Sequence, residues 1–165
     1  MVKRRFGIIV LLLCFCFCVL PCSVLAASTT DAKEPISVDE DCTLTVYYGC
    51  DGTAFSNQTV KLYRVADVSA DFQYTLTPPY VASQLILNGI QTNGEWNVIR
   101  STLETYILAN AIEPAMSVTT DASGNANFEA LKPGLYLTSA LYVTLEDQHC
   151  SFDSALVALP GLGED

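Results

Sequence analysis

Alternation of apolar and polar side chains predicts two strands in the first half of the chain. Leu44 and Val46 alternate with threonines over residues 42–48, as expected for a strand with one buried face. A turn and a loop over residues 49–58 lead to a second run of strand-forming residues, 59–68. The two runs indicate a chain that builds its core from sheets.

Residues 118–137 carry the most informative pattern, three short apolar runs separated by two turns. The first turn is indicated by residues that tolerate positive φ or fold back onto the backbone, namely Asp121, Ser123, Gly124 and Asn125. Alternation resumes over residues 125–131, and Lys132-Pro133-Gly134 predicts a second turn before the run 135–137. We expect a hairpin at the first turn and a meander that runs from the edge of a β-sandwich into its core.

One helix is expected, over residues 93–110. Asn93 is the expected N-cap, and Glu95 lies favourably in the first turn. Apolar side chains recur at spacings of three and four, at Trp96, Ile99, Leu103, Tyr106 and Ile107. Such a stripe is more typical of a core than of a ligand site, so we expect it to pack on the sheet. Residues 71–79, before the helix, are expected to be irregular.

The first 26 residues have the pattern of a secretory signal peptide. Lys3, Arg4 and Arg5 precede an apolar run of about 15 residues, and small residues end the segment at Ala26. The run is shorter than the roughly 20 residues that cross a bilayer. A lipoprotein signal ending at Cys22 is an alternative, although proline stands where its motif requires a small residue. We expect cleavage, a flexible leader at 27–41, and a secreted or cell-surface protein.

Charge and length narrow the class of partner. All 18 acidic residues follow Ala26, and removing three of the eight basic residues with the signal leaves a net charge of −13. Nucleic acid and anionic membranes are therefore disfavoured as partners, and contact with a membrane is expected only through the signal peptide. The remaining residues suffice for one domain, expected at 42–165.

Three cysteines remain after the signal peptide is removed, Cys42, Cys50 and Cys150. Cys42 and Cys50 bracket the first predicted strand, which holds them roughly 26 Å apart and prevents a bond between them. A disulfide would therefore join Cys150 to either Cys42 or Cys50. With His149 as the single histidine and no closely spaced cysteine pair, zinc is not expected.

Catalytic residues are not indicated. A triad of Asp147, His149 and Ser151 can be written down, but no activated-serine motif accompanies it. Residues 121–125 lack the full ligand set of a calcium loop, and a turn explains them. We expect no enzymatic activity, no cofactor and no metal.

Three separated motifs resemble the prealbumin-like, collagen-adhesin B-type modules of Gram-positive surface proteins and pilins. They are VKLYRVADV at 60–68, the segment 120–137, and SFDSALVALP at 151–160. The resemblance implies an Ig-like or prealbumin-like β-sandwich with an inserted helix. Its central motif corresponds here to Thr120, Asp121, Gly124, Phe128, Leu131, Gly134, Leu135, Tyr136 and Leu137.

Modules of this family often carry an isopeptide bond between a buried lysine on the first strand and an Asn or Asp on the last. The first predicted strand here contains no lysine. Lys61 is expected on the solvent face of the second strand, and Lys132 in a turn. We therefore predict no isopeptide bond within this chain.

The resemblance also predicts an incomplete domain. The linking lysine, the sorting signal and the last strand of such pilins would follow residue 160. The run Leu159-Pro160-Gly161-Leu162-Gly163 only outlines a sorting motif, because Leu162 stands where the motif requires threonine. We expect a fragment of a longer protein, with an open edge on its first strand.

The function expected is that of an exported structural or adhesion module, a rigid spacer and attachment surface. Its partners would be other surface-protein or pilin subunits, or a host or matrix ligand. The alternative is a secreted module that binds carbohydrate or peptide in an aromatic groove around Trp96, Tyr47, Tyr48 or Tyr80.

Overall fold

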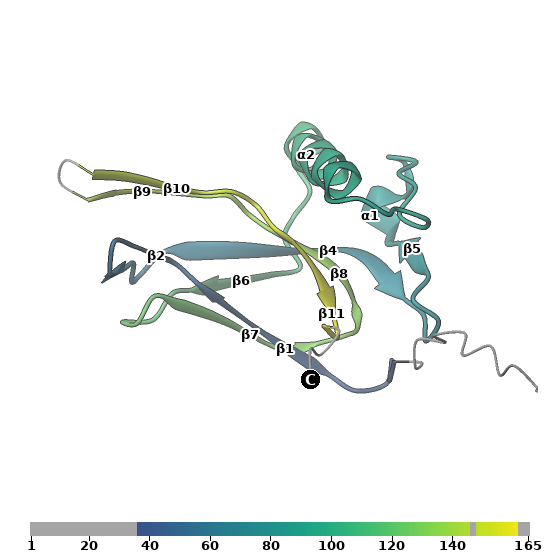
Figure 1. Ribbon diagram of the computed structural model, residues 1–165, viewed down its shortest axis with the longest axis horizontal. Helices are drawn as coiled ribbons and strands as arrows, with labels where there is room; N and C mark the ends of the chain where they lie inside the picture. The colour runs from purple at the N-terminus through teal and green to yellow at the C-terminus, as the bar shows by residue number, and fades with distance from the viewer. Residues whose placement is uncertain (1–35, 146–147, 162–165) are drawn as a thin grey trace, which may run out of the picture. The chain divides into compact units, whose positions relative to one another are not determined.

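The computed structural model describes residues 36–145 and 148–161. The predicted signal peptide, most of the predicted leader, Asp147 and the residues after Gly161 lie outside these ranges. The described part is rich in antiparallel β-structure and contains one long helix (Figure 1).

A five-stranded antiparallel sheet forms the centre of the fold. Its strands are β4 (Thr59–Val68), β5 (Tyr74–Leu76), β6 (Met116–Thr119), β8 (Gly134–Thr138) and β11 (Leu156–Leu159). The order is β11-β8-β4-β5, and β6 pairs with β4 on the same edge as β5, opposite β8. The bounds of β4 confirm the predicted second strand. Residues 71–79 were wrongly expected to be irregular, because they contain β5 and the start of a short helix.

A second, two-stranded sheet pairs β1 (Cys42–Tyr47) with β7 (Asn125–Leu131). The first predicted strand is thus confirmed, and in the described ranges no strand pairs with its other edge. The predicted hairpin at the first turn is wrong, since β6 joins the central sheet while β7 joins β1. The predicted meander is wrong for the same reason, because β7 and β8 also lie in different sheets.

A small two-stranded unit, β2 (Gly49–Cys50) with β3 (Thr53–Ala54), follows β1 directly. The sequence predicts only a turn here. Backbone hydrogen bonds hold the unit in place: the Phe55 amide donates to the Tyr48 carbonyl at 2.9 Å, and the Tyr48 amide donates to the Gly124 carbonyl at 2.8 Å. The unit therefore rests on the turn between β6 and β7.

The family-like motif at 151–160 contains the end of one strand and the whole of another. A hairpin of β9 (Leu141–Leu145) and β10 (Gln148–Phe152) precedes β11. Between β10 and β11 the chain passes Thr138, at the end of β8. The Thr138 amide donates to the Ala155 carbonyl, and the Thr138 hydroxyl accepts from the Ala155 amide at 3.0 Å. β8–β9 and β10–β11 thus form one long hairpin with a break at its middle (Figure 1).

Two helices lie between β5 and β6, α1 (Pro78–Val81) and α2 (Asn93–Ala109). The position of α2 confirms the predicted helix, but Thr92 and not Asn93 is its N-cap. The Thr92 hydroxyl accepts from the Glu95 amide, and the Glu95 carboxylate accepts from the Thr92 amide at 2.9 Å, which makes a capping box.

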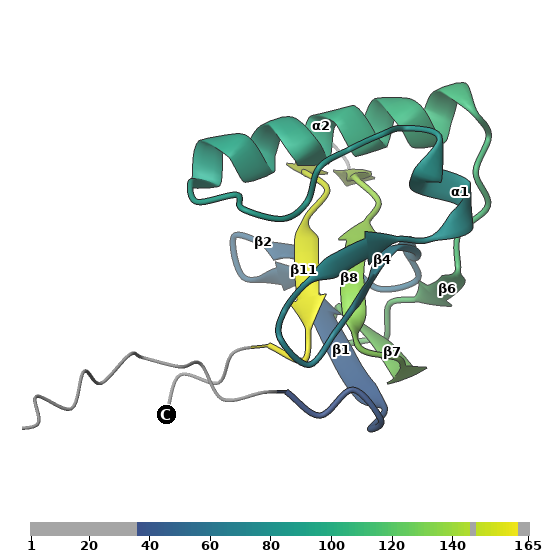
Figure 2. The same ribbon diagram turned by 90° about the vertical axis from the view of Figure 1, so that its right-hand side faces the viewer.

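Side chains on the two faces of the central sheet form two separate clusters. The first core cluster, toward β1 and β7, contains Tyr48, Phe55, Val60, Leu62, Ala126, Phe128, Leu131, Tyr136, Val143 and Leu159. The second core cluster, toward the helices, contains Tyr63, Val65, Ala66, Tyr80, Leu87, Ile99, Leu103, Ile107, Leu135 and Leu137. Figure 2 shows α2 along one face of the sheet and β1 with β7 on the other side.

Candidate functional site

The turn between β6 and β7 explains the polar residues of the family-like motif. The Asp121 carboxylate accepts from the amides of Ser123 at 2.8 Å and Asn125 at 2.9 Å. These hydrogen bonds, that from Asn125 above all, lower the pKa of Asp121. Gly124 has a φ of +80°, and a Cβ there would lie 2.5 Å from the Tyr48 carbonyl oxygen. Both residues therefore serve the backbone of the turn.

Thr120 is the buried polar residue at this corner, 4% exposed. Its hydroxyl donates to the Phe55 carbonyl at 2.6 Å and accepts from the Gln58 amide at 2.9 Å. It therefore ties the end of β6 to the segment that enters β4. The role of Thr120 was not apparent from the sequence, since its partners lie more than 60 residues earlier.

The other motif residues belong to the core or to a close contact between strands. Gly134 is needed because a Cβ at that position would lie 2.5 Å from the Ala66 carbonyl oxygen on β4. The apolar members are all buried, at 5% exposure or less: Phe128, Leu131, Leu135, Tyr136 and Leu137. The structure thus brings the motif together as a packing unit across the two sheets.

Lys61 and Lys132, the two lysines in the described ranges, lie at the surface. Lys61 is exposed between the buried Val60 and Leu62, as predicted from alternation. Lys132 pairs with Asp41, with 2.6 Å between Nζ and Oδ1, and its side chain is 57% exposed. Neither lysine has the apolar surroundings that would disfavour the ammonium form. The absence of an isopeptide bond stays a prediction.

The aromatic residues of the alternative hypothesis do not form one groove. Tyr48 and Tyr80 are 3% and 2% exposed and belong to different core clusters. Trp96 stacks edge-on against Tyr74, with ring centroids 6.2 Å apart, at the border of the second core cluster. Tyr47 alone is well exposed, at 56%. A binding surface assembled from all four side chains is therefore incompatible with their positions.

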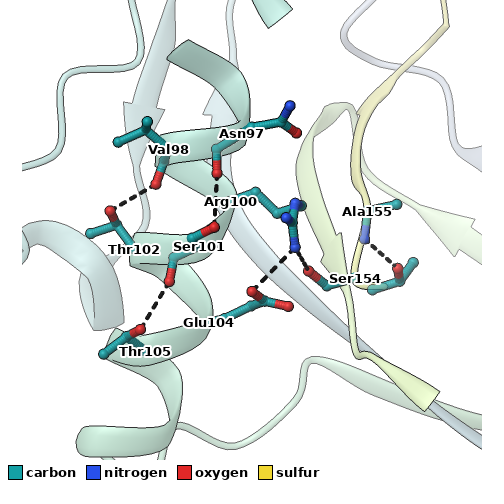
Figure 3. A network of polar contacts seen from close by, with 10 residues as sticks. Asn97, Val98, Arg100, Ser101, Thr102, Glu104, Thr105, Ser154 and Ala155 are labelled. Carbon is teal, nitrogen blue, oxygen red and sulfur yellow. Dashed lines mark hydrogen bonds and ion pairs between the residues drawn. The ribbon is translucent and has the colours of Figure 1, made fainter. Parts of the chain in front are cut away.

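A polar cluster that the sequence did not indicate joins α2 to the segment between β10 and β11 (Figure 3). Arg100 Nη1 lies 3.2 Å from Glu104 Oε2 and donates to Ser154 Oγ at 3.0 Å. The pair Arg100 and Glu104 could have been found from its spacing of four on a helix. Ser154 could not, because 54 residues separate it from Arg100.

This cluster borders a shallow pocket of about 370 Å³, lined also by Trp96 and Asp153. Ser154 is 4% exposed and accepts a hydrogen bond from a guanidinium. A guanidinium stays protonated and cannot remove the proton of a hydroxyl. The arrangement therefore suits attachment of the helix and hydrogen bonding to a ligand, and it supplies no activated nucleophile.

Two residues of the rejected triad, His149 and Ser151, lie on β10. His149 Nδ1 is 3.1 Å from Thr144 Oγ1 across the hairpin, and Ser151 pairs with Tyr142. Asp147 lies outside the described residues. Within residues 36–145 and 148–161 there is no group of three or more His, Cys, Asp or Glu side chains that could hold a metal ion.

Two of the three remaining cysteines are neighbours. The Cys50 thiol makes a side-chain hydrogen bond with Cys150, which raises the pKa of Cys50 to about 11. Cys42 lies at the other end of β1, opposite Leu131. Of the two pairings that the sequence left open, the structure thus favours Cys50 with Cys150.

No helix in the described ranges has the length and apolar character needed to cross a membrane. No protein-family model matches the chain, and a search of curated proteins finds no match. The resemblance to pilin and adhesin modules therefore stays a prediction from the three sequence motifs.

Proposed function

We propose that this chain is an exported cell-surface module, pilin-like or adhesin-like, that acts as a rigid spacer and attachment surface. The observation that supports it best is the arrangement of residues 120–137. Each motif residue that suggested the family has a structural role, either in the corner between the two sheets or in their packing. A spacer needs this kind of stiffness between sheets.

The proposed fold type is a prealbumin-like β-sandwich with an inserted helix. The central sheet and the β1–β7 sheet enclose the first core cluster, as the two layers of a sandwich do. The helix α2 covers the opposite face of the central sheet. In this proposal, the helix is the insertion that distinguishes the module from a bare sandwich.

The partners proposed are subunits of the same surface assembly, or a host or matrix ligand. Among the exposed apolar side chains, Tyr142 on β9 and Leu108 on α2 are each 82% exposed. The unpaired edge of β1 offers backbone groups to an added strand. These features favour contact with other proteins over a deep small-molecule site.

An immunoblot of cell-wall extract tests the proposal. The extract, from cells that naturally produce the chain, is boiled in detergent with excess reductant and probed with antibody against residues 36–161. The reductant removes multimers that are linked only through cysteines. We expect bands in the cell-wall fraction, and a ladder of multimers would indicate covalent assembly.

A single wall-associated band would indicate a singly anchored spacer. Signal confined to the cytoplasm would contradict the proposal, since both the spacer and its attachment surface must lie outside the cell. Signal confined to the culture medium would favour the secreted binding module.

A further inference from the structure

We propose that Cys50 and Cys150 form a disulfide bond that fastens the hairpin of β9 and β10 to β2, directly after the first strand. Nothing in the proposed surface role requires this bond, and the bond can form whether or not that role is correct. The two cysteines lie 100 positions apart in the chain, in β2 and β10.

The hairpin turns one face toward the first core cluster. Cys150 pairs with Val143 and Phe152 pairs with Leu141 across the ladder, and these four side chains all pack on that cluster. His149, Ser151, Tyr142 and Thr144 alternate with them and are exposed. Alternation therefore fixes the Cys150 side chain on the inner face.

Aromatic contacts indicate which cysteine faces Cys150. The Phe152 ring lies edge-on to Tyr48, with centroids 5.1 Å apart, and to Phe55, with centroids 5.8 Å apart. Cys50 is two residues after Tyr48, and Cys150 is two residues before Phe152. Stepping two residues along each segment from the Tyr48–Phe152 contact leads to the two cysteines, which are in hydrogen-bonding contact.

Cys42 is excluded as the partner by its position. It pairs with Leu131 at the beginning of β1, and β1 alone spans on the order of 16 Å. A bond from Cys42 would require the hairpin to leave Tyr48 and Phe55. Cys42 therefore serves as the matched control in the experiments below.

Bond formation needs an oxidant, and a low-molecular-weight disulfide such as oxidised glutathione suffices. One cysteine thiolate attacks a glutathione sulfur and releases one glutathione thiolate, leaving a mixed disulfide. The second cysteine thiolate attacks the protein sulfur of that mixed disulfide and releases the other glutathione thiolate. The two protons lost by the cysteines go to the two glutathione thiolates, so two protein thiols are oxidised and one glutathione disulfide is reduced.

Both cysteines are partly exposed, so such an oxidant can reach them. The bond would hold in place a two-stranded hairpin, a unit that is marginally stable by itself. Because it closes a loop of about 100 residues, it restricts the unfolded chain strongly.

Peptide mapping tests the pairing. The full chain is folded in a buffer of oxidised and reduced glutathione, its remaining thiols are alkylated, and it is digested with chymotrypsin, which cuts after Tyr47 and Tyr48 and so separates Cys42 from Cys50. We expect a linked peptide that contains Cys50 and Cys150. Alkylation of both residues, or a link from Cys150 to Cys42, would overturn the proposal.

Thermal unfolding with and without reductant tests whether the bond stabilises the folded chain. We expect reductant to lower the melting temperature of the natural chain and of Cys42→Ser by on the order of 10 °C. Reductant should leave Cys50→Ser and Cys150→Ser unchanged. The comparison within the natural chain remains informative if a variant fails to fold. An equal reductant effect in Cys50→Ser, or none in the natural chain, would overturn the proposed role.

Discussion

On one face of the central sheet, the first core cluster packs against strands, and on the other face the second core cluster packs against helices. The first is built from segments distant in sequence, such as Tyr48, Phe128 and Leu159. The second takes Ile99, Leu103 and Ile107 from a single helix. The strand side therefore depends on long-range pairing, whereas part of the helix side is set by local periodicity.

Strand β4 contributes to both faces because its side chains alternate, and a bulge then changes the phase of that alternation. Leu62 belongs to the first core cluster, and Tyr63 and Val65 to the second. The register against β8 shifts between Arg64 and Ala66, so Ala66 joins the second cluster together with Val65. A substitution on either face should therefore change the stability of the whole sheet.

The largest expected effect is at Phe128, which is fully buried in the first core cluster. Phe128→Ala should lower the free energy of unfolding by about 3–5 kcal/mol, because it leaves a cavity between the two sheets. Urea unfolding measures the loss. Phe128→Leu, which keeps most of the volume, should lose less. A loss under about 1 kcal/mol for the alanine variant would contradict close packing between these sheets.

The equivalent test of the helix side is Leu103→Ala, which should cost about 2–5 kcal/mol since Leu103 is fully buried. Leu108, 82% exposed on the same helix, is the matched control, and Leu108→Ala should change stability by less than about 0.5 kcal/mol. Hydrogen exchange can separate the two faces. In Leu103→Ala, amides of α2 should lose more protection than those of β1 and β7, and uniform loss would contradict a separate helix cluster.

Local patterns predicted part of this fold well. Alternation gave β1 and β4 with their bounds within a residue, and the spacing of apolar residues gave α2. These elements each have one dominant buried face or a strong helical period. The N-cap was misplaced by one residue because Asn93 and Thr92 are both acceptable caps, and the capping box with Glu95 decides between them.

Pairing between distant segments could not be read from the same patterns. The turn residues after β6 were correctly identified, but a turn does not specify whether its two strands pair with each other or with other strands. All five residues of β8 are buried, so it shows no alternation. The break between β10 and β11 depends on the Thr138 side chain, and the cluster at Arg100 depends on Ser154. Both partners are distant in sequence.

The corner that joins the two sheets can be tested with a pair of glycines. Gly124 and Gly52 both have a φ of +80°, but only Gly124 would place a Cβ against neighbouring atoms. Gly52→Ala should cost about 1–2 kcal/mol from the backbone conformation alone. Gly124→Ala should cost more in urea unfolding, because the Tyr48 carbonyl must move. Equal losses would show that the corner tolerates the added atom.

The smallest expected effect is on the pH dependence of stability, and it compares one carboxylate near each core cluster. Hydrogen bonds lower the pKa of Asp121, and the largest contribution comes from the Asn125 amide. Hydrogen bonds also lower the pKa of Glu95, and the largest contribution comes from the Thr92 hydroxyl. A carboxyl whose pKa is lower in the folded protein stabilises it above the unfolded pKa. That contribution is lost as the pH falls from about 4.5 through the folded pKa.

Urea midpoints measured from pH 7 down to strongly acidic pH test this expectation. Asp121→Asn and Glu95→Gln keep an acceptor oxygen but cannot ionise, so each should weaken the acid dependence relative to the natural chain. Amide hydrogen exchange in the β6–β7 turn should report the effect of Asp121→Asn. Amide hydrogen exchange in the first turn of α2 should report the effect of Glu95→Gln. An acid dependence that is the same in both variants as in the natural chain would show that Asp121 does not stabilise the β6–β7 turn and that Glu95 does not stabilise the start of α2.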